Sequence, residues 1–221
     1  MRVEVEEVVA ECKPPDNGAG PFWCYGAPLL VRRGRWVYLS AMETGEGVPK
    51  LCNTRPRVFA RRDSEGWRLV WQPEGFRERE PCPLVASGAD LLLSVNPSTR
   101  PPGEMYGPCD PHLLCFARAR FDRPQRSAPH WPDDARFTDH SYRGIGVCSL
   151  TGEALLLQID AASGAYHWAL RNARGEWPAT GRLAFPIRSC YPQVLLRRGA
   201  AHVLAIGDIV EPVEEWRQWK R

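Results

Sequence analysis

Four consecutive residues, His140 to Arg143, form the densest group of chemically capable side chains in the sequence. A histidine can act as a general base near neutral pH, and a tyrosine can act as an acid or as an activated nucleophile. An arginine can hold a carboxylate through two parallel hydrogen bonds. We therefore predict catalytic roles for His140 and Tyr142 and a substrate-binding role for Arg143. The alternative is that His140 and Tyr142 only anchor their loop through hydrogen bonds.

The elements that must position these residues repeat along the chain. Residues 190–210 are predicted as two short apolar strands around Gly199, because glycine supplies the positive φ that a tight hairpin turn needs. The same pattern recurs at residues 24–41, 81–95 and 140–159. The turn glycines are Gly34, Gly88, Gly152 and Gly199, which are 54, 64 and 47 residues apart. An internal repeat of this length is typical of propellers and solenoids.

Each repeat supplies up to four short strands with short connections, as one blade of a β-propeller does. The predicted fold class is all-β, a β-propeller with four recognisable blade repeats of which the last is incomplete. After an N-terminal strand and loop at 1–21, we expect propeller blades through 22–221, at about 22–72, 80–126, 140–185 and, partially, 189–221.

The incomplete fourth repeat leaves two interpretations open. Only residues 212–221 follow the last hairpin, which is too little for two more strands. The chain is then part of a larger propeller of about six or seven blades, within the usual range for this architecture. In the alternative interpretation, the alternating strand Val3–Val9 completes the fourth blade.

Whole-chain properties exclude several classes of protein. The 221 residues carry a net charge of +3 without a long basic block, so we expect no nucleic-acid partner. Residues 1–10 carry acids where a signal peptide has an apolar core, and no run of 18 apolar residues indicates a membrane span. A cytoplasmic location is therefore expected, and secretion stays open if the natural N-terminus lies elsewhere.

The chain has eight cysteines, and several of them, such as Cys24, Cys82, Cys148 and Cys190, lie in or beside the repeated inner strands. These are expected to be buried, reduced thiols that behave as small hydrophobic residues. No Cys-x-x-Cys motif occurs, and no pair of histidines has the spacing of a zinc site. We therefore predict no metal and no cofactor.

Two turns carry a further signature that points to a family. Residues 61–67 and 171–177 resemble the Asp-box turn, which runs Ser/Thr-x-Asp-x-Gly-x-x-Trp, with a spacing that differs by a residue or two. In such a turn an Asp or Asn caps backbone amides, the Gly adopts a left-handed conformation, and the Trp covers the hairpin. The matching residues are Asp63, Gly66, Trp67, Asn172, Gly175 and Trp177. With the blade period, the chain resembles the BNR-repeat, sialidase-like propellers over residues 22–221. Its closing segment and the segment from His140 look most like uncharacterised bacterial members that act on polysaccharides.

This resemblance implies a carbohydrate-active protein, because the families include sialidases, other glycosidases and propeller polysaccharide lyases. In sialidases the first inner strand begins with Arg-Ile-Pro, and the arginine binds a carboxylate. This chain has Gly26, Ala27 and Pro28 there, so that arginine is missing. Sialic acid is therefore a poor candidate substrate, and uronic-acid-containing or neutral glycans stay open.

Propeller geometry predicts where further site residues lie. The loops leading into each blade, and those joining its second and third strands, should gather on one face. Glu43, Asp208 and Glu211 are candidate carboxylates for a glycosidase, which needs a pair about 5 to 10 Å apart. We assign a catalytic role to Glu43 and substrate binding to Asp208 and Glu211. The other predicted substrate-binding residues are Tyr25, Arg55, Arg188 and Tyr191.

The sequence thus predicts a propeller that cleaves a glycan or polysaccharide, as a glycoside hydrolase or as a lyase. The alternatives are a non-catalytic propeller that binds glycan or protein, and an inactive fragment of a larger enzyme, since a fold alone does not fix function. The expected partners are the glycan and either missing blades or a second copy of the chain at the open face, with no nucleic acid and no membrane.

Overall fold

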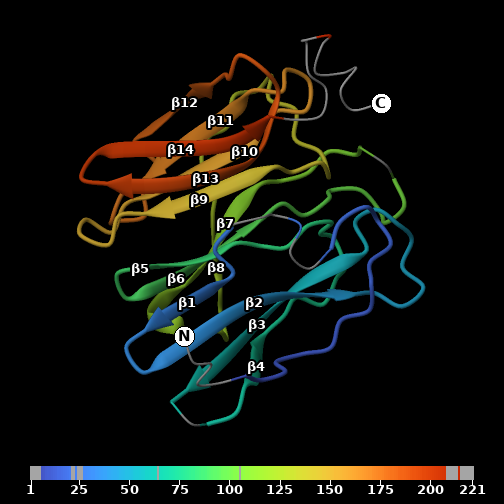
Figure 1. The fold of residues 1–221 in the computed structure, drawn as a ribbon, viewed down its shortest axis with the longest axis vertical. Coiled ribbons are helices and arrows are strands. Elements are labelled where there is room, and N and C mark those ends of the chain that lie inside the picture. The colour runs from blue at the N-terminus through green and yellow to red at the C-terminus, as the bar shows by residue number, and fades with distance from the viewer. Residues whose placement is uncertain are drawn as a thin grey trace.

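The computed structural model describes residues 6–20, 23, 27–63, 65–104, 106–207 and 214. In this part of the chain, three four-stranded antiparallel sheets and one two-stranded sheet follow one another (Figure 1). The longest helical segment with printed bounds is a single 3₁₀ turn, Ala117–Ala119. The predicted all-β fold with four blade repeats is therefore confirmed.

Each complete blade is a meander whose strands pair in chain order. The first blade contains β1 (Leu30–Arg33), β2 (Trp36–Thr44), β3 (Thr54–Arg62) and β4 (Arg68–Trp71). The second contains β5 (Leu84–Ser87), β6 (Asp90–Val95), β7 (His112–Phe116) and β8 (Gln125–Ser127). The third contains β9 (Arg143–Val147), β10 (Ala154–Ile159), β11 (Tyr166–Arg171) and β12 (Ala179–Leu183). The fourth blade is the hairpin of β13 (Ser189–Arg197) and β14 (Ala200–Gly207).

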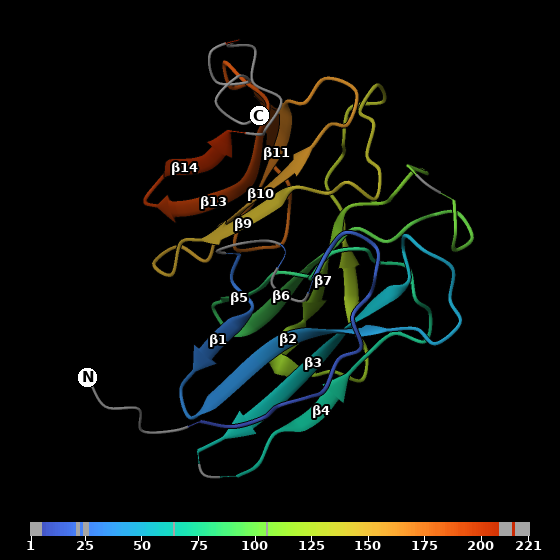
Figure 2. The same ribbon diagram turned by 45° about the vertical axis from the view of Figure 1, so that its right-hand side comes forward.

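The first strands of successive blades lie next to one another. β1 contacts β5, β5 contacts β9, and β9 contacts β13, so successive blades lie next to one another along their innermost strands (Figure 2). The hairpin turns between the first and second strands lie on one side of the molecule, and the loops between the second and third strands lie on the other (Figure 1). This is the arrangement of loops that the propeller prediction requires.

The four hairpin glycines occupy equivalent turns, as predicted. Gly34, Gly88, Gly152 and Gly199 have φ values of 58°, 57°, 74° and 76°. Backbone in this region is strained for residues with a Cβ, so glycine at these points fixes where each blade folds back.

The core lies between blades, and the period-two alternation of each second strand distributes its side chains to both sides. In β6, Leu91 and Leu93 pack with residues of the first blade, whereas Leu92 packs with residues of the third. All three leucines are fully buried. In β10, Leu155 and Leu157 pack against the fourth-blade hairpin, whereas Leu156 faces the second blade. Strands buried on both faces are continuously apolar, which explains the leucine runs in the sequence.

The fourth-blade hairpin has one covered and one open face. Its covered face contributes Cys190 and Leu196 to the core of the third blade. On the open face, the residues Leu195, Leu204 and Ile206 are 60%, 72% and 57% exposed. β13 is the only strand that pairs with β14 among the described residues. Completion by further blades, or self-association at this face, stays a prediction.

The structure tests the predicted N-terminal strand at Val3–Val9 only at residues 6–9, where the prediction is wrong. Residues 1–5 lie outside the described residues, and residues 6–9 form no strand. This segment is held by side-chain contacts and not by the backbone hydrogen bonds of a strand pair. The Glu7 carboxylate pairs with Arg61 at 2.8 Å and accepts a hydrogen bond from the Trp67 indole at 2.9 Å, both on the first blade.

The two Asp-box-like turns differ from each other. At the second, the Asn172 Oδ1 accepts hydrogen bonds from the amides of Arg174 (2.9 Å) and Glu176 (3.0 Å), and Gly175 has a φ of 88°, as predicted. At the first, the left-handed residue is Asp63 itself, with a φ of 46°, and its carboxylate pairs with Arg35 on the neighbouring hairpin. The predicted left-handed glycine at Gly66 is therefore wrong.

The second blade has its own outer strand, separate from the segment of residues 128–139 that follows it. That strand is β8, which pairs with β7 and ends at Ser127. The residues after it return to the inner edge of the third blade.

None of the helical segments in the described part of the chain has the length and apolarity that a membrane crossing requires.

Candidate functional site

An open pocket of about 550 Å³ lies on the face where the loops between second and third strands gather. Three blades contribute to its lining. Tyr106 comes from the β6–β7 loop, Thr138 and His140 from the segment leading into β9, and Arg188 from the segment leading into β13; residues 159–164, at the end of β10 and in the loop after it, complete the wall. The structure thus brings His140 and Arg188, two of the predicted site residues, to one pocket.

Aromatic rings form a continuous wall beside this pocket. The His140 ring lies between Tyr106 and Tyr142, with ring centroids 6.1 and 5.4 Å apart. The ring centres of Tyr142 and Tyr191 are 5.0 Å apart, and the guanidinium carbon of Arg188 lies 5.8 Å from the centre of the Tyr142 ring. The predicted residues Tyr142, Tyr191, His140 and Arg188 are therefore one contiguous cluster.

Tyr191 has an unusual backbone conformation and a raised hydroxyl pKa. Its φ of 51° is in the left-handed region, which a bulky residue adopts only when the surrounding structure holds it there. Burial, together with negative charge that Tyr142 and Cys190 would carry when ionised, raises the pKa of the Tyr191 hydroxyl well above its usual value. Tyr191 is therefore a neutral hydrogen-bonding group at physiological pH and not a nucleophile.

The buried carboxylate of Asp160 shapes one side of the pocket. It accepts hydrogen bonds from the amides of Ser163 (2.7 Å), Ala162 (2.9 Å) and Arg136 (3.0 Å). Burial alone would raise the pKa of Asp160, but these hydrogen bonds outweigh it and lower the pKa. Asp160 therefore holds the β10–β11 loop in place, with both oxygens occupied by the protein.

The structure places Arg143 away from the pocket wall, contrary to its predicted exposure to substrate. The residue is 2% exposed. Its guanidinium donates to the Ser141 hydroxyl (2.9 Å) and the Pro81 carbonyl (3.0 Å), and it lies 3.4 Å from the Glu78 carboxylate. The reason is strand periodicity: a Cβ at Gly144 would point at β13, so the side chain of residue 143 points the other way, towards the second blade.

Buried acidic residues beside Arg143 had no role in the sequence prediction. Glu78 accepts a hydrogen bond from the Asn96 amide (2.8 Å), and Glu80 accepts one from the Ser141 hydroxyl (3.2 Å). Burial raises the pKa of both glutamates, and the nearby Arg143 offsets part of this rise. The signal in the sequence is the alternating Arg-Glu-Arg-Glu of residues 77–80 immediately before an apolar strand.

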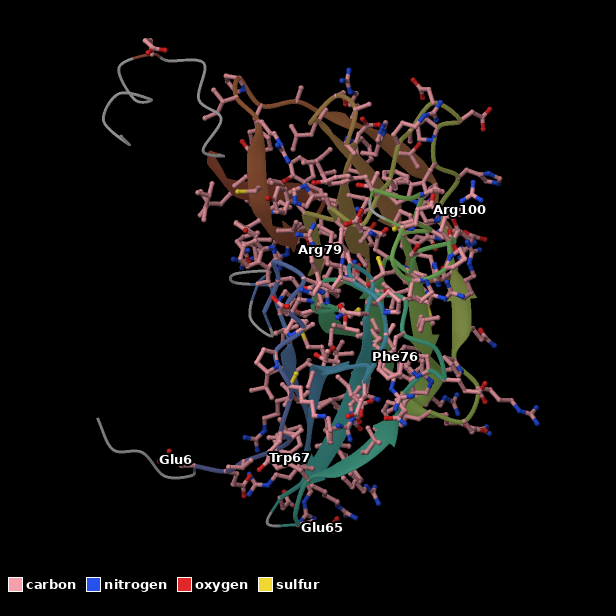
Figure 3. All side chains as sticks on the ribbon, turned by 90° about the vertical axis from the view of Figure 1, so that its right-hand side faces the viewer. Glu6, Glu65, Trp67, Phe76, Arg79 and Arg100 are labelled. Atoms are coloured by element: carbon pink, nitrogen blue, oxygen red, sulfur yellow. The ribbon has the colours of Figure 1, made fainter. Side chains whose placement is uncertain are left out.

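A third buried carboxylate, Asp139, stands next to His140. Its side chain is 1% exposed and lies 3.6 Å from the guanidinium of Arg79. Figure 3 shows Arg79 near the middle of the molecule. In the described part of the chain, neither carboxylate oxygen of Asp139 has a hydrogen-bond partner. Arg79 itself donates to the Asn17 carbonyl at 3.1 Å. The segment leading into β9 is therefore anchored by charge as well as by packing.

We expect protonation of the buried glutamates to make the folded state more stable in mild acid than in mild alkali. A raised folded-state pKa means that stability is fully present below the ordinary value near 4.5 and is lost as pH rises through the raised value. Asp110 and Asp160 have lowered pKa values, so the stability that they contribute is lost only in stronger acid. The melting temperature should therefore fall between pH 5 and pH 8 by less in Glu80→Gln than in the unmodified protein. If the melting temperatures of Glu80→Gln and of the unmodified protein change with pH in the same way, Glu80 does not have a raised pKa in the folded state.

Glu43 and Arg55, predicted for catalysis and binding, are partners of each other in the first blade. They are directly opposite in the β2–β3 register, and their side chains form an ion pair at 2.5 Å. Arg55 also donates to the Pro73 carbonyl (2.9 Å) and lies 4.7 Å from the centre of the Phe76 ring. Neither residue lines the pocket beside His140. Tyr25, Asp208 and Glu211 lie outside the described residues.

Among the described residues, no cluster of three or more His, Cys, Asp or Glu side chains could hold a metal ion. The side chains in the pocket lining that can bind or act on a ligand include the His140 imidazole, the Tyr106 hydroxyl and the Arg188 guanidinium.

Comparison with known proteins gives a likeness in fold. No protein-family model and no curated protein matches the chain. An exo-β-1,3-galactanase from Phanerochaete chrysosporium, solved with β-1,3-galactotriose, matches with a TM-score of 0.51 at 10% identity over 83% of this chain and 43% of the galactanase chain. A GH43 endo-arabinanase from Bacillus licheniformis matches with a TM-score of 0.46 at 14% identity over 88% and 67% of the two chains. This chain thus spans less than half the length of the galactanase, and the galactanase match supports the propeller fold.

Proposed function

We propose that the pocket lined by His140 and Arg188 binds an acidic glycan and that the chain belongs to a carbohydrate-active propeller that cleaves it. The observation that carries the proposal is the convergence of a cation and an imidazole, from the segments leading into two successive blades, on one open pocket with an aromatic wall. Pockets of this size with a few convergent polar groups are the usual form of a small-ligand site. The substrate of the galactanase, a structure with the same fold, supports a glycan as the ligand class.

The described residues favour elimination on a uronate over hydrolysis. In this proposal Arg188, which lines the pocket, holds the sugar carboxylate, and the neighbouring C5 proton becomes easier to remove. His140 takes that proton, the C5 electron pair forms a C4–C5 double bond, and the glycosidic oxygen leaves from C4 with a proton from the Tyr142 hydroxyl. Hydrolysis would need two open carboxylates about 5 to 10 Å apart. The one carboxylate in the lining of the pocket, that of Asp160, is occupied by backbone amides.

Two more specific alternatives are part of this proposal. One is that the glycan is cleaved by hydrolysis, and the other is that the chain belongs to the sialidase-like BNR group. The capped turn at Asn172 supports the BNR resemblance. A hydrolase would take its carboxylates from Asp208 and Glu211, outside the described residues. A non-catalytic glycan-binding propeller is the second candidate function, since the same pocket would serve binding alone.

The test is turnover on a panel of uronate-bearing polysaccharides. We expect His140→Ala and Tyr142→Phe each to lower kcat by about a hundredfold, the lower range for general acid–base catalysis, with a smaller change in binding. An unsaturated uronate product, detected by its ultraviolet absorbance, identifies elimination. The matched control is Arg174→Ala, an exposed residue at an outer turn of the third blade, which should keep full turnover.

Three results would contradict parts of this proposal separately. Full turnover in both variants would show that the site assignment is wrong. New reducing ends without the unsaturated product would replace elimination by hydrolysis. Binding without any turnover in the unmodified chain would leave the glycan-binding function alone.

A further inference from the structure

A second open pocket, of about 560 Å³, lies at the hairpin turns and is lined by residues of the first two blades. These turns are on the side of the molecule opposite the loops that form the pocket beside His140 (Figure 1). Four of the eight lining residues are arginines, namely Arg33, Arg35, Arg62 and Arg118. None of the described residues that line this site is acidic, and we call it the arginine pocket.

Strand register brings the arginines of the first blade together. Trp36 on β2 is directly opposite Arg33 on β1 and Arg62 on β3, and opposed residues of antiparallel strands share one face of the sheet. The guanidinium carbons of Arg62 and Arg68 lie 5.8 and 5.0 Å from the centre of the Trp36 ring. Further along the same face, Tyr38 is buried in the core between the first two blades. The arginines therefore lie at the end of the seam between these blades.

The carboxylate beside the pocket leaves most of this positive charge uncompensated. Asp63 pairs with Arg35, and the hydrogen bond from Arg35 lowers the pKa of Asp63, so this pair is ionised at neutral pH. In the part of the chain that the structure describes, no carboxylate forms an ion pair with Arg33, Arg62 or Arg118. Like charges at neighbouring positions of a sheet destabilise it. An anion in the pocket would offset this repulsion.

The second blade contributes a wall with an uncommon backbone conformation. Arg118 and Ala119, in the 3₁₀ turn after β7, have φ values of 51° and 56°. Residues with a Cβ seldom adopt this region, and those that do cluster at sites that hold ligands. The amide of Arg118 donates to the Asp90 carboxylate at 2.9 Å, which fixes the turn. One arginine of the lining is thus carried on a backbone that the protein holds in place.

We propose that the arginine pocket binds a phosphate or sulfate group, carried by a ligand other than the glycan in the pocket beside His140. A guanidinium has five N–H donors and no acceptor, and its planar fork matches two oxygens of such a group. Phosphate and sulfate supply several acceptor oxygens and close to two negative charges at neutral pH. The two pockets share no lining residue, so this proposal is independent of the proposed function.

Nuclear magnetic resonance of the isotope-labelled full chain, followed at the Trp36 indole N–H, tests the proposal. Sodium sulfate and sodium phosphate are titrated in separate arms, and sodium chloride at equal ionic strength is the control. We expect a saturable shift of the Trp36 signal that chloride does not produce, and the anion with the lower Kd identifies the group. Arg62→Ala should raise this Kd by at least about tenfold, since a hydrogen bond to a charged group contributes about 1.5–3 kcal/mol.

Two further variants separate a built site from general attraction of anions. Arg174→Ala removes the same charge from an exposed turn of the third blade and should leave the Kd unchanged. Asp63→Asn should lower the Kd, because it frees Arg35 for the anion, and asparagine tolerates the left-handed backbone of Asp63.

Four results would overturn the proposal. The first is a Trp36 shift with neither anion beyond that with chloride, and the second is an equal rise of the Kd in Arg62→Ala and Arg174→Ala. The third is a Kd that is unchanged or higher in Asp63→Asn. The fourth is loss of binding in Arg188→Ala, which lines the pocket beside His140, together with unchanged binding in Arg62→Ala.

Discussion

Replacing Arg143 by alanine is expected to lower the free energy of unfolding by about 3–5 kcal/mol, the cost of breaking a buried ion pair on one side. Arg143 is 2% exposed, and its guanidinium lies between the second and third blades. It neutralises Glu78 and reaches the backbone beside Glu80, both of which are almost fully buried. Without the Arg143 guanidinium, Glu78 and Glu80 would stay in a water-excluded site and would lose this neighbouring cation. Equilibrium denaturation measures the change.

An exposed ion pair supplies the control for this prediction. Arg126 pairs with Asp110 at 2.8 Å, but its side chain is 54% exposed. Arg126→Ala should therefore cost at most about 1 kcal/mol, as surface pairs do. Adding Glu78→Gln to Arg143→Ala should recover part of the loss, because it removes one of the unpaired charges. If Arg143→Ala costs no more than Arg126→Ala, the buried network does not hold the blades together.

Gly146→Ala is expected to destabilise the protein by about 3 kcal/mol, the upper end of the cost of overpacking a core. A Cβ at this position would lie 2.6 Å from the Val194 carbonyl oxygen and 2.8 Å from its Cγ1. The obstructing oxygen belongs to the backbone of β13, so a rotamer change cannot relieve the contact. β13 would have to move away from β9, which opens the core shared with Leu155 and Leu196.

The matched control is the same substitution at Gly66. A Cβ there meets nothing within 4 Å, and the backbone is not left-handed. Gly66→Ala should therefore leave stability unchanged or raise it slightly, since alanine reduces the freedom of the unfolded chain. Similar melting temperatures for Gly146→Ala and Gly66→Ala would contradict the packing of the fourth blade on the third.

The fold was largely predictable because its signals are local. A glycine in each hairpin turn and the leucine runs of β6 and β10 each depend on neighbours in sequence. The predicted strand at Val3–Val9 was wrong at residues 6–9 for the opposite reason. An alternating pattern shows that a segment can pair as a strand, but the presence of a free strand edge to receive it depends on the rest of the fold.

The candidate site was predictable only in part. Propeller geometry correctly indicated that loops leading into different blades converge, and His140 and Arg188 do line one pocket. Arg143 could have been assigned to the interior from Gly144 and Gly146, since two glycines two residues apart mark the crowded face of a strand. Its partner Glu78 lies 65 residues away in sequence, which no local pattern reveals.

The central claim, that Arg188 binds the acidic group of a glycan in this pocket, is tested most directly by calorimetric titration. A uronate oligosaccharide and its counterpart with the carboxyl groups reduced to alcohols are each titrated into the unmodified chain and into Arg188→Ala. We expect Arg188→Ala to weaken binding of the uronate by at least about tenfold, since a hydrogen bond to a charged group contributes about 1.5–3 kcal/mol, and to leave the weaker binding of the reduced sugar unchanged. Equal affinity of both proteins for the uronate would contradict the claim.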